Sequence, residues 1–195
     1  MQTWVALLYS IVLGPKRRVV MAELRALAAE LGFEAPRTLL ASGNLILAAE
    51  AGDARAVEAR IEPAFAERFG RPIDIIVRGG AKWKELLAGN PFPDESERTP
   101  SRVWARVMRA PVDAELADRL ERWRTGGERV AVVGGDLWVF MPDGVAGSRL
   151  ASAMTPARTG GAGTFRNWNT LRKIGAALDE SPSGPPRRSA RPRVR

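Results

Sequence analysis

The sequence predicts an α+β fold made of two ferredoxin-like halves, each with the element order βαββαβ, plus a closing C-terminal helix. Two observations predict this fold. Stretches with strand and helix periodicity follow one another as strand, helix, strand, strand, helix, strand, which is the order of a split βαβ unit. The same order then recurs, and the turn at residues 42–45 has a counterpart at residues 134–137. Such a recurrence indicates internal duplication of one supersecondary unit.

The first half comprises residues 1–79. Its expected elements are a strand at 4–13, a helix at 21–31, a hairpin of 38–41 with 45–48, a helix at 57–69 and a strand at 73–78. The apolar run from Trp4 to Leu13 is typical of a central strand that is covered on both faces. Gly32 is a natural end for the first helix, and Pro63 predicts a kink or a break in the second.

Residues 80–100 are expected to connect the halves through a short helix around Trp83 and a polar linker at 94–100. Residues 101–178 form the second half together with the closing helix. Its expected elements are a strand at 102–108, a helix capped by Asp113, a hairpin of 130–133 with 137–141, a short helix within 145–154, a strand at 164–166 and the closing helix at 168–178. Residues 179–195 are rich in Pro, Gly, Ser and Arg, a composition that predicts a disordered basic tail.

The chain contains no cysteine and no histidine. This excludes disulfides, thiolate nucleophiles, zinc sites built on Cys or His, Ser-His-Asp catalysis and a histidine general base. No cofactor and no metal site are expected. No uncharged apolar run approaches the ~20 residues of a membrane-spanning helix, and the apolar start lacks the flanking features of a signal peptide. We therefore expect a cytoplasmic protein without membrane association.

The formal net charge of +8 raises the question of a nucleic-acid partner. Residues 181–195 hold five arginines and no acidic residue, which leaves 8 − 5 = +3 for residues 1–180. The basicity is therefore mostly a property of the tail, and the charge of the remaining chain supports a polyanionic partner only weakly.

A first candidate ligand site combines the basic loop at Lys16 and Arg17 with a turn formed by Ser42, Gly43 and Asn44. In a split βαβ unit, the loop after the first strand and the turn between the second and third strands lie at the same end of the sheet. The basic loop also precedes a helix N-terminus, where free N–H groups attract anions. These residues would suit a phosphate or a carboxylate. The alternative is a solvated basic loop beside an ordinary hairpin.

A second candidate is the segment that contains Arg166, Asn167, Trp168 and Thr170, which places several hydrogen-bonding side chains beside an aromatic ring. In a binding role, Arg166 and an asparagine would hold a carboxylate or phosphate, and Trp168 would form a wall of the site. In a structural role, Asn167 or Asn169 would cap the closing helix, and Trp168 would fill the core. The sequence leaves both roles open.

A nucleic-acid surface is the alternative to a small-ligand site. Arg102, Trp104 and Arg106 alternate onto one face of their strand, and Trp138 and Phe140 alternate on a strand expected to be its neighbour. Together they would form an aromatic and basic platform on which bases stack. The alternative is that these aromatic faces are buried where the two halves pack against each other.

The order and spacing of several short motifs resemble those of the domain-of-unknown-function 1697 family of bacterial proteins. The motifs are Val5-Ala6-Leu7-Leu8, Met21-Ala22-Glu23-Leu24-Arg25, Ser42-Gly43-Asn44, Asn90-Pro91-Phe92, Pro142-Asp143-Gly144, Ser148-Arg149-Leu150 and Arg166-Asn167-Trp168-Asn169-Thr170. The resemblance covers residues 1–178 and implies an α+β fold with ferredoxin-like halves and no established activity. Tyr9-Ser10-Ile11-Val12 stands where members of the family usually carry an Arg-Gly-Ile-Asn-like run.

These features favour a protein that binds a small ligand or a partner, with no catalytic residue assigned. The first alternative is nucleic-acid binding through the Trp and Arg sheet face and the arginine-rich tail. The second is an enzyme that acts on an anionic small molecule, which the absence of histidine and cysteine disfavours. Neither the partner nor the ligand is identified beyond this anionic class.

Overall fold

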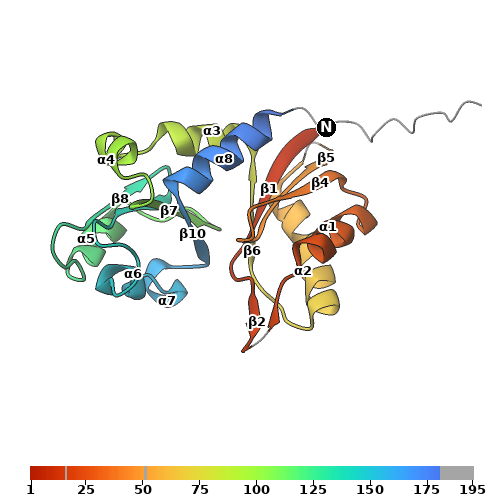
Figure 1. Ribbon diagram of the computed structural model, residues 1–195, viewed down its shortest axis with the longest axis horizontal. Coiled ribbons are helices and arrows are strands. Elements are labelled where there is room, and N and C mark those ends of the chain that lie inside the picture. The colour runs from red at the N-terminus through yellow and green to blue at the C-terminus, as the bar shows by residue number, and fades with distance from the viewer. Residues whose placement is uncertain (16, 51, 181–195) are drawn as a thin grey trace, which may run out of the picture.

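The protein folds into two antiparallel four-stranded sheets with helices packed on them (Figure 1). The structure is a computed structural model that describes residues 1–15, 17–50 and 52–180. The mixed α and β content agrees with the predicted α+β class. Within the described ranges, no helix combines the length and apolar character needed to cross a bilayer.

The first sheet has the strand order β4-β5-β1-β6. Its strands are β1 (Gln2–Leu8), β4 (Glu34–Leu39), β5 (Asn44–Ala49) and β6 (Ile75–Gly79). Helices α1 (Met21–Glu30) and α2 (Ala54–Phe69) cover one face of this sheet. The α2 helix continues through Pro63, so the expected break is absent. Because proline has no backbone N–H, the carbonyl of Ala59 loses its helical hydrogen-bond partner at Pro63. Both residues are exposed, so water can bond to that carbonyl instead.

The segment after β1 differs from its prediction as one long strand. β1 ends at Leu8, and the chain then forms a small hairpin of β2 (Val12–Gly14) and β3 (Arg17–Arg18) that projects from the first half in Figure 1. The backbone N–H of Tyr9 donates to the carbonyl of Asp74, one residue beyond the last pair of β1 with β6, and the chain leaves the sheet after this bond. Tyr9 and Val12 are exposed, so the apolar run is not buried along its whole length.

The second sheet has the strand order β10-β7-β9-β8. Its elements are β7 (Val103–Met108), α5 (Glu115–Glu121), β8 (Arg129–Val133), β9 (Asp136–Phe140), α6 (Arg149–Ala153), α7 (Pro156–Thr159) and β10 (Gly163–Asn167). The N-cap of α5 is Ala114, so the expected cap by Asp113 is wrong. Asp113 instead contributes its backbone carbonyl, which accepts from the N–H of Leu116.

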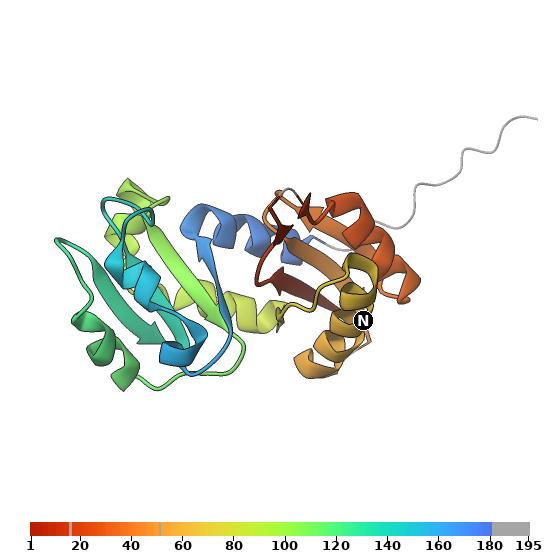
Figure 2. The ribbon, with the colours of Figure 1, turned by 90° about the horizontal axis from the view of Figure 1, so that it is seen from below.

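Two helices, α3 (Gly80–Ala88) and α8 (Trp168–Asp179), join the halves. A further helix, α4 (Pro93–Arg98), occupies most of the expected polar linker. α3 and α8 pack against each other across both halves, as Figures 1 and 2 show from two directions. The indole Nε1 of Trp83 donates to the carbonyl of Leu171 over 3.1 Å, which fixes this packing.

A single central core forms between the two sheets. It contains one face of each sheet together with α3 and α8, including Leu7, Ile76, Trp83, Trp138 and Ile174. Separate apolar clusters lie under α1 and α2 on the first sheet and under α5 and α6 on the second. The shared core fixes how the halves sit relative to each other, and the spaces left between them are therefore part of the folded structure.

Candidate functional site

Arg166, on β10 of the second half, contacts the turn at residues 42–44 of the first half and is only 6% exposed. Its Nε donates to Oδ1 of Asn44 over 2.6 Å, and its Nη2 donates to the carbonyl of Ser42 over 3.0 Å. The other acceptors are the hydroxyl of Thr164 and the carbonyls of Leu8, Gly43 and Phe165. The structure therefore brings together two of the predicted clusters.

These contacts occupy all five N–H donors of the Arg166 guanidinium. Burial lowers the pKa of Arg166 to about 10, because the acceptors around it are neutral oxygens that compensate only partly for lost water. The hydrogen bonds of Arg166 to Leu8, Ser42, Gly43 and Asn44 form a joint that connects the second half to the first. Ligand binding by Arg166 with Ser42, Gly43 and Asn44 stays a prediction, and it would require some of these bonds to break.

The rest of the second candidate segment has a clear structural role. Asn167 is the N-cap of α8, and its side chain accepts from the backbone N–H of Thr170 over 3.0 Å. Trp168 packs on the central core, with its ring centroid 6.0 Å from that of Trp138. The structural alternative that the sequence left open is thus realised for Asn167 and Trp168.

The basic loop contributes less to the turn than expected. Lys16 lies outside the described residues. Arg17 is exposed on β3, and its guanidinium lies near Gly70 at the end of α2. The segment after β1 does reach Gly43, but it does so through the side chain of Ile11. The expected grouping of Arg17 with residues 42–44 stays a prediction, since the neighbour found for the Arg17 guanidinium is Gly70.

The predicted aromatic platform is wrong in its geometry. Trp104 pairs with Val139, and Ala105 pairs with Trp138. Since directly opposed residues share a face of a sheet, Trp104 and Trp138 lie on opposite faces. Trp138 is fully buried in the central core, as the packing alternative proposed. A difference of one residue in register inverts the face of every side chain on a strand.

The remaining platform residues each pack against other parts of the chain, with Arg106 buried and Arg102 and Phe140 partly buried. Arg106 is 4% exposed, its guanidinium lies 5.4 Å from the ring centroid of Phe165, and burial lowers its pKa. The guanidinium of Arg129 lies 5.3 Å from the ring centroid of Phe140. The Arg102 guanidinium lies against Gly144. These residues do not form a shared exposed surface for stacking bases.

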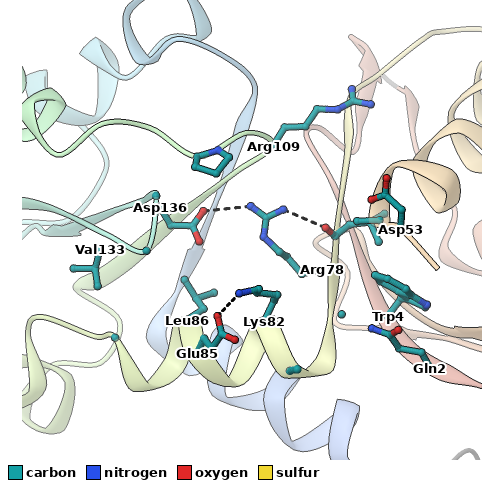
Figure 3. A pocket seen from close by; sticks show the side chains of 18 of the residues that line it. Gln2, Trp4, Asp53, Arg78, Lys82, Glu85, Leu86, Arg109, Val133 and Asp136 are labelled. Carbon is teal, nitrogen blue, oxygen red and sulfur yellow. Dashed lines mark hydrogen bonds and ion pairs between the residues drawn. The ribbon is translucent and has the colours of Figure 1, made fainter. Parts of the chain in front are cut away.

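A cleft of about 510 Å³ lies between the halves, over the first turns of α3 (Figure 3). Its lining comes from β6, the β8–β9 turn, α3 and the start of α2. The polar lining residues include Gln2, Asp53, Arg78, Lys82, Glu85, Arg109 and Asp136. Sequence reasoning did not identify this cleft, because its walls come from segments that lie far apart along the chain between Gln2 and Asp136.

Two arginines cross this cleft in opposite directions. Arg78, on β6 of the first half, donates to the carbonyl of Met108 in the second half and lies 3.5 Å from Oδ1 of Asp136 (Figure 3). Arg109, in the second half, reaches back to three acidic side chains of the first half. Its partners are Glu58, Glu62 and Asp74, with N···O distances of 3.0–3.2 Å. The two arginines fix the separation of the cleft walls.

Asp136 is an acidic group of the cleft with a perturbed pKa. Burial raises the pKa of its carboxyl, while Arg78 and the backbone N–H of Met108 act in the opposite direction and do not cancel that effect. The Met108 N–H donates to Oδ1 of Asp136 over 2.7 Å. A buried carboxyl with a perturbed pKa in a cleft is a common feature of functional sites. No three acidic side chains in the described chain gather closely enough to hold a metal ion.

Comparison with known proteins gives a family and a fold. The family model described as a protein of unknown function (DUF1697) matches residues 1–138, which is more than two thirds of the chain. The chain belongs to this DUF1697 family. The result confirms the resemblance noted from the sequence motifs. A search of the curated proteins found no match.

A solved structure resembles this DUF1697 protein over nearly its whole length. It is that of the conserved bacterial protein SP0830 from Streptococcus pneumoniae, with a TM-score of 0.71 and 22% sequence identity. The similarity covers 92% of this chain and 99% of the other. At this identity the likeness concerns the fold alone.

The sequence of this DUF1697 protein does carry signals for the cleft. The pair Gly79-Gly80 joins β6 directly to α3, and the pair Gly134-Gly135 precedes Asp136 in the β8–β9 turn. Each pair adjoins one charged residue of the cleft, Arg78 or Asp136. The approach of Arg78 to Asp136 depends on how the halves pack, which no local sequence pattern specifies.

Proposed function

We propose that this protein binds a small molecule in the cleft between its two halves. The observation that carries the proposal is the cleft itself, whose volume of about 510 Å³ falls within the range of about 300–1,000 Å³ typical of ligand sites. Ligand sites also occur preferentially at such junctions. The lining combines apolar surface from Trp4 and Leu86 with the charged groups of Arg78 and Asp136, which suits oriented binding.

The crossed arginines support a cleft that is formed before the ligand arrives. Arg78 and Arg109 each tie one half to the other, and the central core lies beside them. A site that is already shaped loses less conformational freedom on binding, which favours affinity. The joint at Arg166 has its donors occupied, so the cleft is the better candidate for the ligand site.

A screen of small metabolites by NMR tests the proposal on the full chain. The amides of Gly79, Gly89 and Gly135 line the cleft and report binding there. Ala81, which is exposed and lines the cleft, offers a blocking variant, Ala81→Trp. Ala88→Trp, on the same helix, exposed and outside the lining, is the matched control.

We expect at least one compound to shift the cleft amides in the wild type and in Ala88→Trp, but not in Ala81→Trp. Binding that Ala81→Trp leaves unchanged would place the compound elsewhere and contradict the proposal. A screen spanning neutral, cationic and anionic compounds in which none binds would contradict it as well.

We also infer that the two halves are ferredoxin-like units that arose by internal duplication, at about residues 1–79 and 101–178. The support is the strand order. Numbered within its own half, without the β2–β3 hairpin, each sheet has the order 4-1-3-2. Sequence comparison of the halves across the DUF1697 family tests the duplication.

A cytoplasmic location remains part of the proposal, supported by the lack of cysteine.

A further inference from the structure

Arg78 has donors that the fold leaves available within the cleft. Its side chain is 19% exposed, and it extends between the walls in Figure 3. Nη1 donates to the carbonyl of Val77 over 3.1 Å, and Nη2 donates to the carbonyl of Met108. The 3.5 Å separation from Asp136 exceeds the length of a charge-assisted N–H···O bond, about 2.7–2.9 Å. Since a guanidinium has five donors, the described residues leave some of them free for another acceptor.

The acidic groups Asp136 and Glu85 of the cleft have partners of their own. Asp136 accepts the 2.7 Å bond from the backbone N–H of Met108, and Glu85 pairs with Lys82 at 2.6 Å. Burial raises the pKa of Asp136 despite the nearby guanidinium, so the pair with Arg78 compensates only partly for the lost hydration of the carboxylate. An anion that approaches Arg78 more closely can therefore compete with Asp136 for it.

Lys82 supplies a second cation at the rim of the cleft. Its side chain is 70% exposed and pairs only with Glu85 among the described residues, three positions along α3. Such an exposed pair is weak and exchanges readily with other ions. Arg78 inside and Lys82 at the rim thus define a path along which negative charge is favoured.

We propose that the ligand of this cleft carries an anionic group, a carboxylate or a phosphate, that binds Arg78 between the halves with Lys82 at the rim. This inference rests on the proposed function and names the chemical class of its ligand. The anion takes the place of Asp136 as the closest charged partner of Arg78. Shape and apolar contacts with the remaining lining select among anionic molecules.

Titration of the full chain with three probes tests the ligand class. Inorganic phosphate, acetate and tetramethylammonium are added separately, and the amides of Gly79, Gly89 and Gly135 are followed by NMR. We expect phosphate or acetate to shift these amides and tetramethylammonium to leave them unchanged. Whichever anion binds more tightly identifies the group, and Ala81→Trp is expected to abolish the shifts while Ala88→Trp preserves them.

Three variants then test the role of charge. Asp136→Asn keeps an oxygen that can accept from the Met108 N–H but removes the competing charge, so we expect the anion to bind about threefold to tenfold more tightly. Lys82→Met is expected to weaken binding about twofold to fivefold. Lys84→Met makes the same change on the same helix, where Lys84 pairs with Asp179 outside the cleft, and is expected to alter binding less than about twofold.

The outcomes separate this inference from the proposed function. Equal anion affinity in wild type, Asp136→Asn and Ala81→Trp would show general attraction to a basic chain and overturn the inference. Suppose that a neutral compound shifts the cleft amides, that Ala81→Trp abolishes these shifts, and that neither phosphate nor acetate binds. This result would overturn the anionic class of the ligand and leave the proposed function standing. A cleft that takes neither the probes nor any compound of the metabolite screen would overturn both.

Discussion

Nε of Arg166 and Oδ1 of Asn44 are joined by a 2.6 Å hydrogen bond between residues 122 positions apart. Asn44 opens β5 of the first sheet, and Arg166 lies on β10 of the second. Asn44 is itself oriented by bonds from Nδ2 to the carbonyl of Leu39 and the hydroxyl of Ser42. One buried pair therefore couples the conformation of a turn in the first half to the edge strand of the second.

Replacement of Arg166 is expected to destabilise the whole protein. Arg166→Met leaves the Asn44 oxygen and several carbonyls without their donor, and each unsatisfied buried group costs about 1–3 kcal/mol. We expect the free energy of unfolding, measured with urea, to fall by about 3 kcal/mol or more. Arg172→Met removes the same charge from an exposed position of α8 and is expected to change stability by less than about 0.5 kcal/mol. Similar losses in both variants would contradict a specific role for the joint.

Arg109 is expected to contribute to the contact between the halves through its three carboxylate partners. Its side chain is 34% exposed, so solvent screening reduces the effect, but Glu58 is 4% exposed and would lose its cation. We expect Arg109→Met to lower the free energy of unfolding by about 1–3 kcal/mol, less at high salt. Arg119→Met breaks only an exposed pair with Glu115 and is expected to cost less than about 0.5 kcal/mol. A loss that does not depend on salt would point to packing rather than charge.

The sequence predicted the features that local patterns determine. The stripe of Leu24 and Leu27 predicted α1, which buries both residues, and two asparagines were candidates for the cap of α8, which Asn167 supplies. The turn at residues 42–44 appeared between two strands as expected. Periodicity and capping act within a few residues, so one sequence is enough to detect them.

The features that escaped prediction depend on packing between distant segments. The face on which Trp138 lies is set by its register against β7, and a shift of one residue reverses the face. The roles of Arg78 and Arg109 depend on partners in the opposite half. Neither residue belongs to a recognisable motif, because each is adapted to a contact that forms only when the two sheets share their core.

Asp136→Asn is expected to change the pH dependence of stability. Below the ordinary aspartate pKa of 3.8, Asp136 is protonated in both the folded and the unfolded chain and adds nothing. Burial raises its pKa in the folded state. As the pH rises above 3.8, the unfolded chain therefore loses its proton first, and the wild type loses stability until Asp136 is ionised in both states.

The free energy of unfolding of Asp136→Asn is therefore expected to rise relative to that of the wild type as the pH increases from 3.8 toward neutrality. Urea denaturation at a series of pH values measures it, with Asp143→Asn, at an exposed position, as the control for removing one negative charge. A variant that becomes less stable than wild type as the pH rises would show that the attraction of Arg78 outweighs the effect of burial.

The two glycines before Asp136 are expected to differ sharply in their tolerance of a side chain. Both have positive φ angles, +61° for Gly134 and +83° for Gly135. A Cβ on Gly134 would meet no heavy atom within 4 Å among the described residues, whereas a Cβ on Gly135 would lie 2.5 Å from Cβ and 2.9 Å from Cα of Pro111. Gly134→Ala should therefore report the backbone conformation alone, and Gly135→Ala should add a steric clash.

We expect Gly134→Ala to lower the free energy of unfolding by about 1–2 kcal/mol, the cost of a left-handed conformation. Gly135→Ala is expected to cost about 1–3 kcal/mol more, because Pro111 has to move and its ring limits how the backbone can adjust. Gly135 and Pro111 both line the cleft, so a movement of Pro111 in Gly135→Ala should also change the NMR signals of the amides of the other cleft glycines. Equal losses in the two variants would mean that Pro111 yields without cost and that this wall of the cleft is less rigid than its contacts indicate.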